Sequence, residues 1–126
     1  MLEQVFEREN YVMMKKMLDA AHRKHQAIAG NLANVDTPGY KRQDIDASFA
    51  KQLQKAARLD DIKAINKLEP TMEMDLHSPA VRPDGNNVQI DKEMMELTKN
   101  ATEFRFLAQY ASTSMQRIKT AITGRV

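Results

Sequence analysis

The chain has 126 residues, no cysteine, no tryptophan and a formal net charge of +2. This length suits one domain rather than two, and the missing cysteines exclude disulfides and cysteine-based metal or redox motifs. Basic and acidic side chains are spread along the whole chain without a basic face or tail, and no run of 18 apolar residues is present, so neither a nucleic-acid partner nor a membrane span is indicated.

The first segment, residues 1–34, is expected to form a helix over residues 5–33. Its apolar residues are spaced alternately three and four positions apart, which keeps them on one side of a helix. His22 and His25 lie three residues apart there, but the neighbouring sequence does not complete a ligand set, so packing is favoured over a metal site. Candidate packing residues of this helix are Met14, Leu18, Ile28 and Leu32.

The middle segment, residues 35–87, interrupts the helical pattern because it contains all four prolines. Pro38-Gly39 predicts a turn, since proline presets φ and glycine accepts a positive φ. A short helix is expected within residues 47–66, where the apolar stripe is weak. Residues 69–87 are polar and rich in proline, so we expect them to be extended or mobile in the free protein. The whole middle segment is expected to have little core of its own.

The last segment, residues 88–126, predicts a second long helix from Asp91 to about position 123. Asp91 is a suitable N-cap and Gly124 a suitable C-terminal stop. At 1.5 Å per residue the helix is about 50 Å long, which is long for a chain of this size. Its candidate packing residues are Met94, Leu97, Phe104, Phe106, Leu107, Tyr110, Met115, Ile118 and Ile122.

The second helix is apolar over much of its circumference between positions 104 and 111. Such a helix is normally buried on several sides. Each large apolar side chain that is buried contributes about 1.5–3 kcal/mol, so several kcal/mol depend on its cover. Either a helix of the middle segment provides the cover, as in a three-helix bundle, or neighbouring subunits do. We predict an all-α fold in which the terminal helices pair as a coiled-coil-like hairpin, with an irregular, partly disordered middle.

Residues 31–41 read Asn-Leu-Ala-Asn-Val-Asp-Thr-Pro-Gly-Tyr-Lys. This run resembles the signature of flagellar rod, hook and hook-associated proteins, in which an N-terminal helix ends in a stretch like A-N-N-x-A-N-x-x-T-P-G-Y/F. Gly30 departs from the Ser or Asn of many relatives. Residues 87–94, which open the second helix, are similar to the N-x-V-x-x-D-x-E-M pattern of proximal rod proteins. The matching motif residues are Asn31, Asn34, Thr37, Pro38, Gly39 and Tyr40.

The resemblance implies a structural subunit of the flagellar basal body rod, the drive shaft that transmits torque for motility. It implies polymerisation through the terminal helices, and a subunit that stays incompletely folded until it is in place. It further implies type III export without a cleavable signal peptide and a location in the cell envelope, as part of the periplasmic rod. The implied partners are further copies of the chain, the rod proteins FlgC, FlgF and FlgG, and the basal-body protein FliE. We expect no enzymatic activity, cofactor or metal.

A second class of function stays open, namely a small helical adaptor or export chaperone that binds a partner helix. That class predicts a compact chain that melts cooperatively, whereas an assembly subunit gains helix when it polymerises. The pairs Asp44/Asp46 and Asp60/Asp61 could suggest acid–base chemistry. Because no glycine-rich loop or nucleophile elbow accompanies them, solvated polar residues are favoured.

Overall fold

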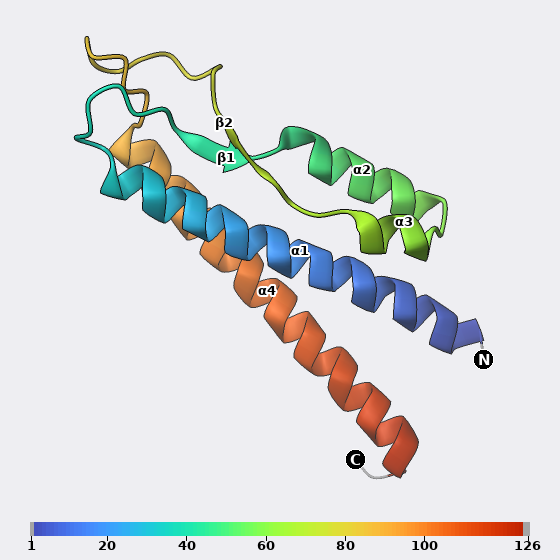
Figure 1. The fold of residues 1–126 in the computed structure, drawn as a ribbon. Coiled ribbons are helices and arrows are strands. Elements are labelled where there is room, and N and C mark those ends of the chain that lie inside the picture. The colour runs from blue at the N-terminus through green and yellow to red at the C-terminus, as the bar shows by residue number, and fades with distance from the viewer. Residues whose placement is uncertain (1, 125–126) are drawn as a thin grey trace.

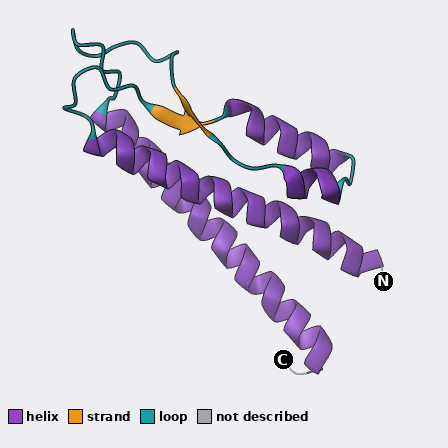
Figure 2. Cartoon of the chain, viewed as in Figure 1, coloured by secondary structure: helices purple, strands orange, loops and turns teal. Residues whose placement is uncertain are grey.

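The computed structural model describes residues 2–124, with side chains from residue 10 onward. Helices dominate the chain, with one small strand pair in its middle (Figures 1 and 2). None of the described helices combines the length and apolarity needed to cross a membrane. In chain order the elements are α1 (Leu2–Ala33), β1 (Gln43–Ile45), α2 (Ala47–Arg58), α3 (Ile62–Lys67), β2 (Met72–Met74) and α4 (Ile90–Thr123).

The two long helices, α1 and α4, lie side by side near the connecting loops and diverge toward their free ends (Figure 1). This arrangement confirms the predicted all-α class and the pairing of the terminal helices. Contact between them is confined to part of α4, since every residue from 115 to 123 is exposed. The hairpin is therefore closed at the loop end and open at the other.

The middle segment is more ordered than we expected. The helix predicted within residues 47–66 is present but divided into α2 and α3, with Asp60 at a positive φ of 51° between them. Phe49, Leu53 and Ile65 form a buried cluster that packs against α1. The expectation of little core here was wrong because α3 supplies Ile65, which completes the weak stripe of α2.

A two-stranded antiparallel sheet joins the two ends of the middle segment. Gln43 of β1 lies opposite Met74 of β2, and Ile45 lies opposite Met72. Residues 69–87 are largely extended, as expected. β-pairing and a hydrogen bond that Asp75 accepts from Arg42 connect them to the rest of the fold, and within the segment Asn87 donates to the Asp75 carbonyl oxygen.

The ends of α4 agree with the sequence at one terminus only. Gly124 stops the helix in the left-handed conformation, at a φ of 63°, as predicted. At the other end Gln89 precedes the helix and makes no side-chain capping bond. The N-cap predicted at Asp91 was wrong. Asp91 lies within the first turn, where a negative charge interacts favourably with the helix dipole.

The face of α4 that the chain buries differs from the apolar row that the sequence suggests. The buried positions are Glu93, Asn100 and Leu107, spaced seven apart. Each comes one residue before a member of that apolar row, namely Met94, Ala101 and Ala108. One residue corresponds to a rotation of about 100° round the helix. Polar groups are tolerated on the buried face because Glu93 and Asn100 both have hydrogen-bond partners on or beside α1. The apolar row itself is left largely uncovered.

Candidate functional site

The motif run of residues 31–41 begins with a fully buried side chain, Asn31. Its amide nitrogen donates to the Gln43 carbonyl oxygen at 2.8 Å and to Glu93 Oε2 at 3.1 Å. Its Oδ1 accepts from the Gln43 backbone nitrogen at 2.8 Å and from the Tyr40 hydroxyl at 3.4 Å. One side chain thereby joins the end of α1, the start of β1 and the first turns of α4.

The turn that follows α1 forms where the sequence predicts it. Gly39 has a φ of 71°, and the Tyr40 nitrogen donates to the Thr37 carbonyl oxygen at 3.3 Å. Proline followed by a positive-φ glycine is the arrangement of a type II turn. Asn34 supports the turn from the helix side, since its amide donates to the Gly30 carbonyl at 2.8 Å and its Oδ1 accepts from the Thr37 hydroxyl at 3.1 Å.

Two buried asparagines that precede α4, Asn86 and Asn87, bond to the turn and to the segment that follows it. The Asn86 amide donates to the carbonyl oxygens of Asn34, Val35 and Thr37 at 2.9–3.2 Å. The Asn87 side chain accepts from the Arg42 backbone nitrogen at 2.6 Å and donates to the Asp75 carbonyl at 2.8 Å. These bonds satisfy backbone groups that neither a helix nor a strand would pair.

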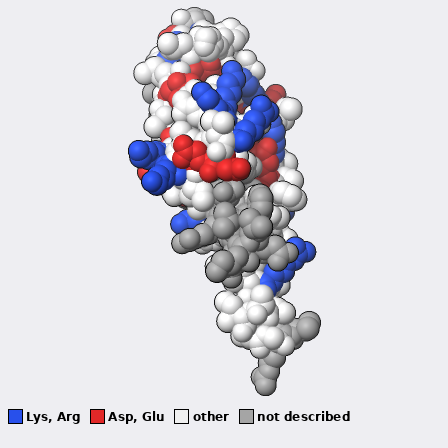
Figure 3. All heavy atoms as spheres, turned by 90° about the vertical axis from the view of Figure 1, so that its right-hand side faces the viewer, with Lys and Arg blue, Asp and Glu red and all other residues white. Residues whose placement is uncertain are grey.

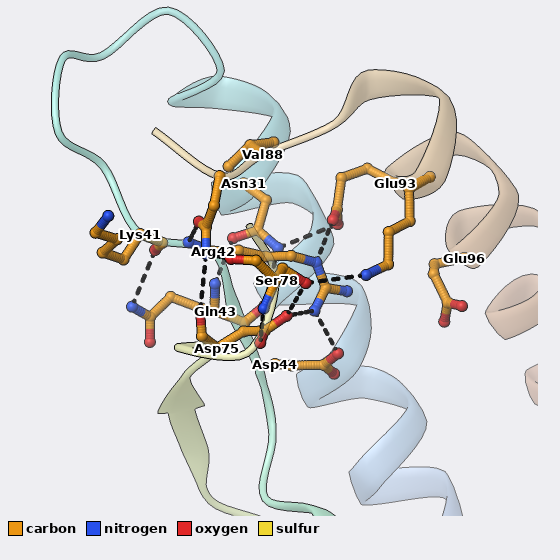
Figure 4. Close-up of polar contacts among 12 residues, drawn as sticks. Asn31, Lys41, Arg42, Gln43, Asp44, Asp75, Ser78, Val88, Glu93 and Glu96 are labelled. Atoms are coloured by element: carbon orange, nitrogen blue, oxygen red, sulfur yellow. Dashed lines mark hydrogen bonds and ion pairs between the residues drawn. The ribbon is translucent and has the colours of Figure 1, made fainter. Parts of the chain in front are cut away.

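Arg42 lies at the centre of the polar junction, with only 4% of its side chain exposed. Its Nε donates to Glu93 Oε1 at 2.5 Å, and its NH1 group donates to Asp44 at 2.7 Å and to Asp75 at 3.1 Å. Figure 4 shows the guanidinium between Glu93 on one side and the two aspartates on the other. We call Asn31, Arg42, Asp44, Asp75, Asn87 and Glu93 the junction network.

The charges of the junction network stabilise one another. Burial disfavours the charged form of Arg42, but hydrogen bonds to Glu93 and Asp44 outweigh it and raise the pKa of the guanidinium. Burial likewise acts to raise the pKa of Asp75, yet bonds from Ser78, the His77 backbone and Arg42 hold that pKa well below its usual range. Arg42 and Asp75 are therefore both charged near neutral pH, and a hydrogen bond joins them.

A second ion pair ties α1 to α4 beside the junction network. Lys24 of α1 contacts Glu96 at 2.8 Å and Asp44 at 3.7 Å. Burial opposes the charged form of Lys24, but its bond to Glu96 raises its pKa, and the same bond lowers the pKa of Glu96. Both partners are about one quarter exposed, so this pair contributes less than the buried one.

An open groove lies further along the same face, between α1, α2 and α4, with a volume of about 620 Å³. Its walls are mostly apolar and include Met17 of α1, Ala50 of α2 and Phe106 of α4. The chain does not fill it, and Phe106 is 71% exposed. The three-helix bundle considered from the sequence is therefore not formed, because α2 and α3 pack on α1 and leave this face of α4 open.

The predicted packing residues divide into two groups. Some are used within the chain: Met14, Ile28 and Leu107 are buried, and Leu18, Leu32 and Leu97 are half-buried. The others remain exposed in the single chain and could contact a neighbour. They are Met94, Phe104, Phe106, Tyr110, Met115, Ile118 and Ile122.

Several residues of the junction were missed by sequence reasoning, above all Arg42, Asp75 and Asn86. The bonds that join Arg42 to Asp75 and Asn86 to Asn34 span 33 and 52 residues along the chain, so no local pattern connects them. Glu93 and Asn100 share a helical face with Leu107, but as polar residues they gave no signal that this face is buried. Asp46 and Asp61, weighed as acid–base candidates, instead cap α2 and α3 through the Ser48 and Ala64 nitrogens.

The described residues assemble no group of three or more His, Asp or Glu side chains that could hold a metal ion. The junction network is held together by bonds among its members and to neighbours such as Gln43, Ser78 and Lys24. Among the described residues, large apolar side chains in the groove and at the open end of α4 remain exposed. The fold is thus that of a helical structural subunit with a rigid junction and uncovered apolar surface.

Comparison with known proteins identifies the family. The profile of the family described as "Flagella basal body rod protein" matches residues 18–41, the second half of α1 and the turn. The flagellar basal body rod protein FlgB of Bacillus subtilis (strain 168) is 32% identical over 119 residues, which cover 88% of this chain and 91% of that protein. FlgB of Aquifex aeolicus (strain VF5) is 29% identical, covering 90% and 92%. FlgB of Escherichia coli (strain K12) is 28% identical, covering 72% and 76%.

The chain belongs to the FlgB family of flagellar basal body rod proteins. The resemblance seen in residues 31–41 is confirmed, and with it the role of a structural rod subunit in motility. The matched segment coincides with the part of α1 that meets the junction network.

Proposed function

We propose that this chain polymerises through its terminal helices as a subunit of the proximal rod, and that the uncovered side of α4 is its main packing surface. The observation that carries the proposal is the exposure of large apolar side chains along α4, including Phe106 at 71% and Ile122 at 79%. Contiguous exposed apolar surface of this kind marks sites of protein–protein contact.

The junction network has a complementary task in this proposal. A drive shaft must pass torque between subunits without letting their helices rotate against each other. Asn31, Arg42 and Glu93 fix the end of α1 to the start of α4 through buried, directional bonds. Polar networks in which every member is satisfied rigidify a structure and specify one geometry. We infer that the junction sets the angle between the two helices, while α4 supplies the contact area.

Membership of the rod-protein family supports a proposal for the partners and the location. We propose that the chain contacts further copies of itself, the rod proteins FlgC, FlgF and FlgG, and the basal-body protein FliE. The assembled rod would lie in the periplasm, after type III export without a cleavable signal peptide. The chain would act without catalysis, and no cofactor or metal enters its role.

The adaptor or export-chaperone alternative predicts a different final position for the chain. A rod subunit remains in purified basal bodies, whereas a chaperone releases its client and stays behind. Basal bodies purified from cells that express a tagged chain in place of the native one should therefore contain it at a fixed ratio to the other rod proteins. A tagged chain found only in the soluble fraction of motile cells would overturn the proposal.

A further inference from the structure

The groove between α1, α2 and α4 contains an unsatisfied polar atom. Asn100, which lines it, is 3% exposed, and its amide nitrogen donates to the Ala21 carbonyl oxygen at 2.9 Å. Its Oδ1 is buried and has no hydrogen-bond partner among the described residues. A buried acceptor without a donor carries a desolvation penalty. The groove therefore suits an occupant that brings both apolar surface and a hydrogen-bond donor.

The rim of the groove favours a basic occupant. Asp46 and Glu103 line the groove and form no ion pair with the described residues, while Lys24 already contacts Glu96 and Asp44. The local charge is consequently negative. An amphipathic helix with basic residues beside an apolar row would match both the walls and the rim.

The free end of α4 has these properties. Met115, Ile118 and Ile122 are exposed and lie on one helical face, at positions i, i+3 and i+7. Arg117 and Lys119 flank them, and no Asp or Glu occurs in the sequence after Glu103. In Figure 3 the projecting lower end of the molecule is mostly uncharged on the face in view and carries blue but no red side chains.

A chain cannot fill its own groove with this segment. Phe106 and Leu107 form a wall of the groove, and Met115 follows further along the same continuous helix. Eight residues of helix place Met115 about 12 Å beyond Leu107 along the helix axis. The occupant must come from another molecule.

We propose that residues 115–123 of one copy dock in the groove of the next copy. The inference rests on the proposed function and deepens it by naming the contact between copies. In this contact Arg117 or Lys119 would face the acidic rim and supply a donor to Asn100. Because the groove and the docking segment are different surfaces, the contact is heterologous and repeats from copy to copy. Such contacts build open helical assemblies rather than closed dimers.

The natural absence of cysteine allows a direct test by cross-linking. Full-length Ala50→Cys places a thiol in the groove, and Ile118→Cys places one on the docking segment. Both variants are expressed together in cells that lack the native chain, and isolated basal bodies are treated with a short bifunctional maleimide. The matched control replaces Ala50→Cys by Lys51→Cys, which is adjacent on α2 but does not line the groove. We expect a cross-linked dimer with Ala50→Cys that is at least ten times more abundant than with Lys51→Cys.

The outcomes separate the inference from the proposed function. Basal bodies that contain both cysteine variants without a cross-linked dimer would overturn the docking contact and leave the rod assignment intact. A cross-link from Ala50→Cys to a different protein would also overturn it, since the occupant would then not be a second copy. If the native chain itself is absent from basal bodies, the proposed function fails and the inference fails with it. Blocking the groove gives an independent check: Ala50→Trp should abolish rod assembly, and Lys51→Trp should not.

Discussion

Arg42 and Glu93 form a buried ion pair, with 2.5 Å between Nε and Oε1. The pair links the residue before β1 to the first turn of α4. Glu93 is fully buried, and its second oxygen accepts from Asn31. The pair therefore lies between the two terminal helices. Breaking it should loosen their relative orientation as well as lower stability.

Removing Glu93 tests the energetic weight of the junction. Glu93→Ala removes the acceptor of Arg42 Nε, while Asp44 and Asp75 still contact the guanidinium. Loss of a buried hydrogen bond to a charged group costs about 1.5–3 kcal/mol. Urea denaturation of the full chain measures the change. The partly exposed pair provides the comparison, since Glu96→Ala should cost about 1 kcal/mol or less. Equal losses for the two variants would contradict the assigned role of the junction.

The junction also predicts a pH dependence. The pKa values of Asp44 and Asp75 are lowered by their bonds to Arg42 and, for Asp75, to Ser78. A carboxyl group with a lower pKa in the folded chain stabilises it above the unfolded pKa of about 4, and this stabilisation is lost as the pH falls through the folded value. The melting temperature should therefore be steady from about pH 5 to 7 and fall below about pH 4. In Asp75→Asn the melting temperature should fall less steeply at acid pH. An unchanged pH dependence would contradict the stabilising role given to the Asp75 carboxylate.

Two glycines next to the turn should respond in opposite ways to alanine. Gly39 has a φ of 71°, where a side chain costs about 1–2 kcal/mol. Gly30 is helical, and an added Cβ would meet only the Tyr40 hydroxyl oxygen at 3.8 Å, an ordinary contact. Gly39→Ala should therefore lower the free energy of unfolding, and Gly30→Ala should raise it by about 0.5–1 kcal/mol. A free energy of unfolding that Gly39→Ala leaves unchanged or raises would contradict the requirement for a positive φ in the turn.

Aspartate substitutions on α4 should separate assembly from folding. Phe106 is exposed, so Phe106→Asp should leave the melting temperature of the single chain nearly unchanged but abolish motility and rod incorporation, while export continues. Phe104→Asp should behave similarly. Leu107 is 8% exposed, so Leu107→Asp should also destabilise the fold by burying a charge. Gln109→Asp, on the exposed side of the same helix, is the matched control and should remain motile.

The comparison of sequence and structure shows where periodicity is informative. The spacing of apolar residues predicted both long helices, and the Pro38-Gly39 pair predicted the turn, because these are local effects. The face of α4 that packs on α1 could not be predicted, because Glu93 and Asn100 are polar and the apolar row next to them looked like the better seam. Their burial depends on partners in α1 that only the fold brings close.

The buried cluster of the middle segment could not be predicted from the sequence either. Phe49 and Leu53 make a stripe too short to indicate a buried helix, and Ile65 belongs to a separate helix. Similarly, nothing local links Asn86 to the carbonyl groups that it caps across 49–52 residues. Long-range polar pairs of this kind leave little trace in a single sequence.

The central claim is that the apolar end of α4 is uncovered in the single chain and becomes covered in the rod. Ile122→Cys gives a thiol at a site that is 79% exposed, in a chain with no other cysteine. Its rate of maleimide labelling can be compared between the purified full-length chain and intact basal bodies that contain it. The account predicts rapid labelling of the free chain and at least tenfold slower labelling in the rod. Equal rates in the two states would contradict it.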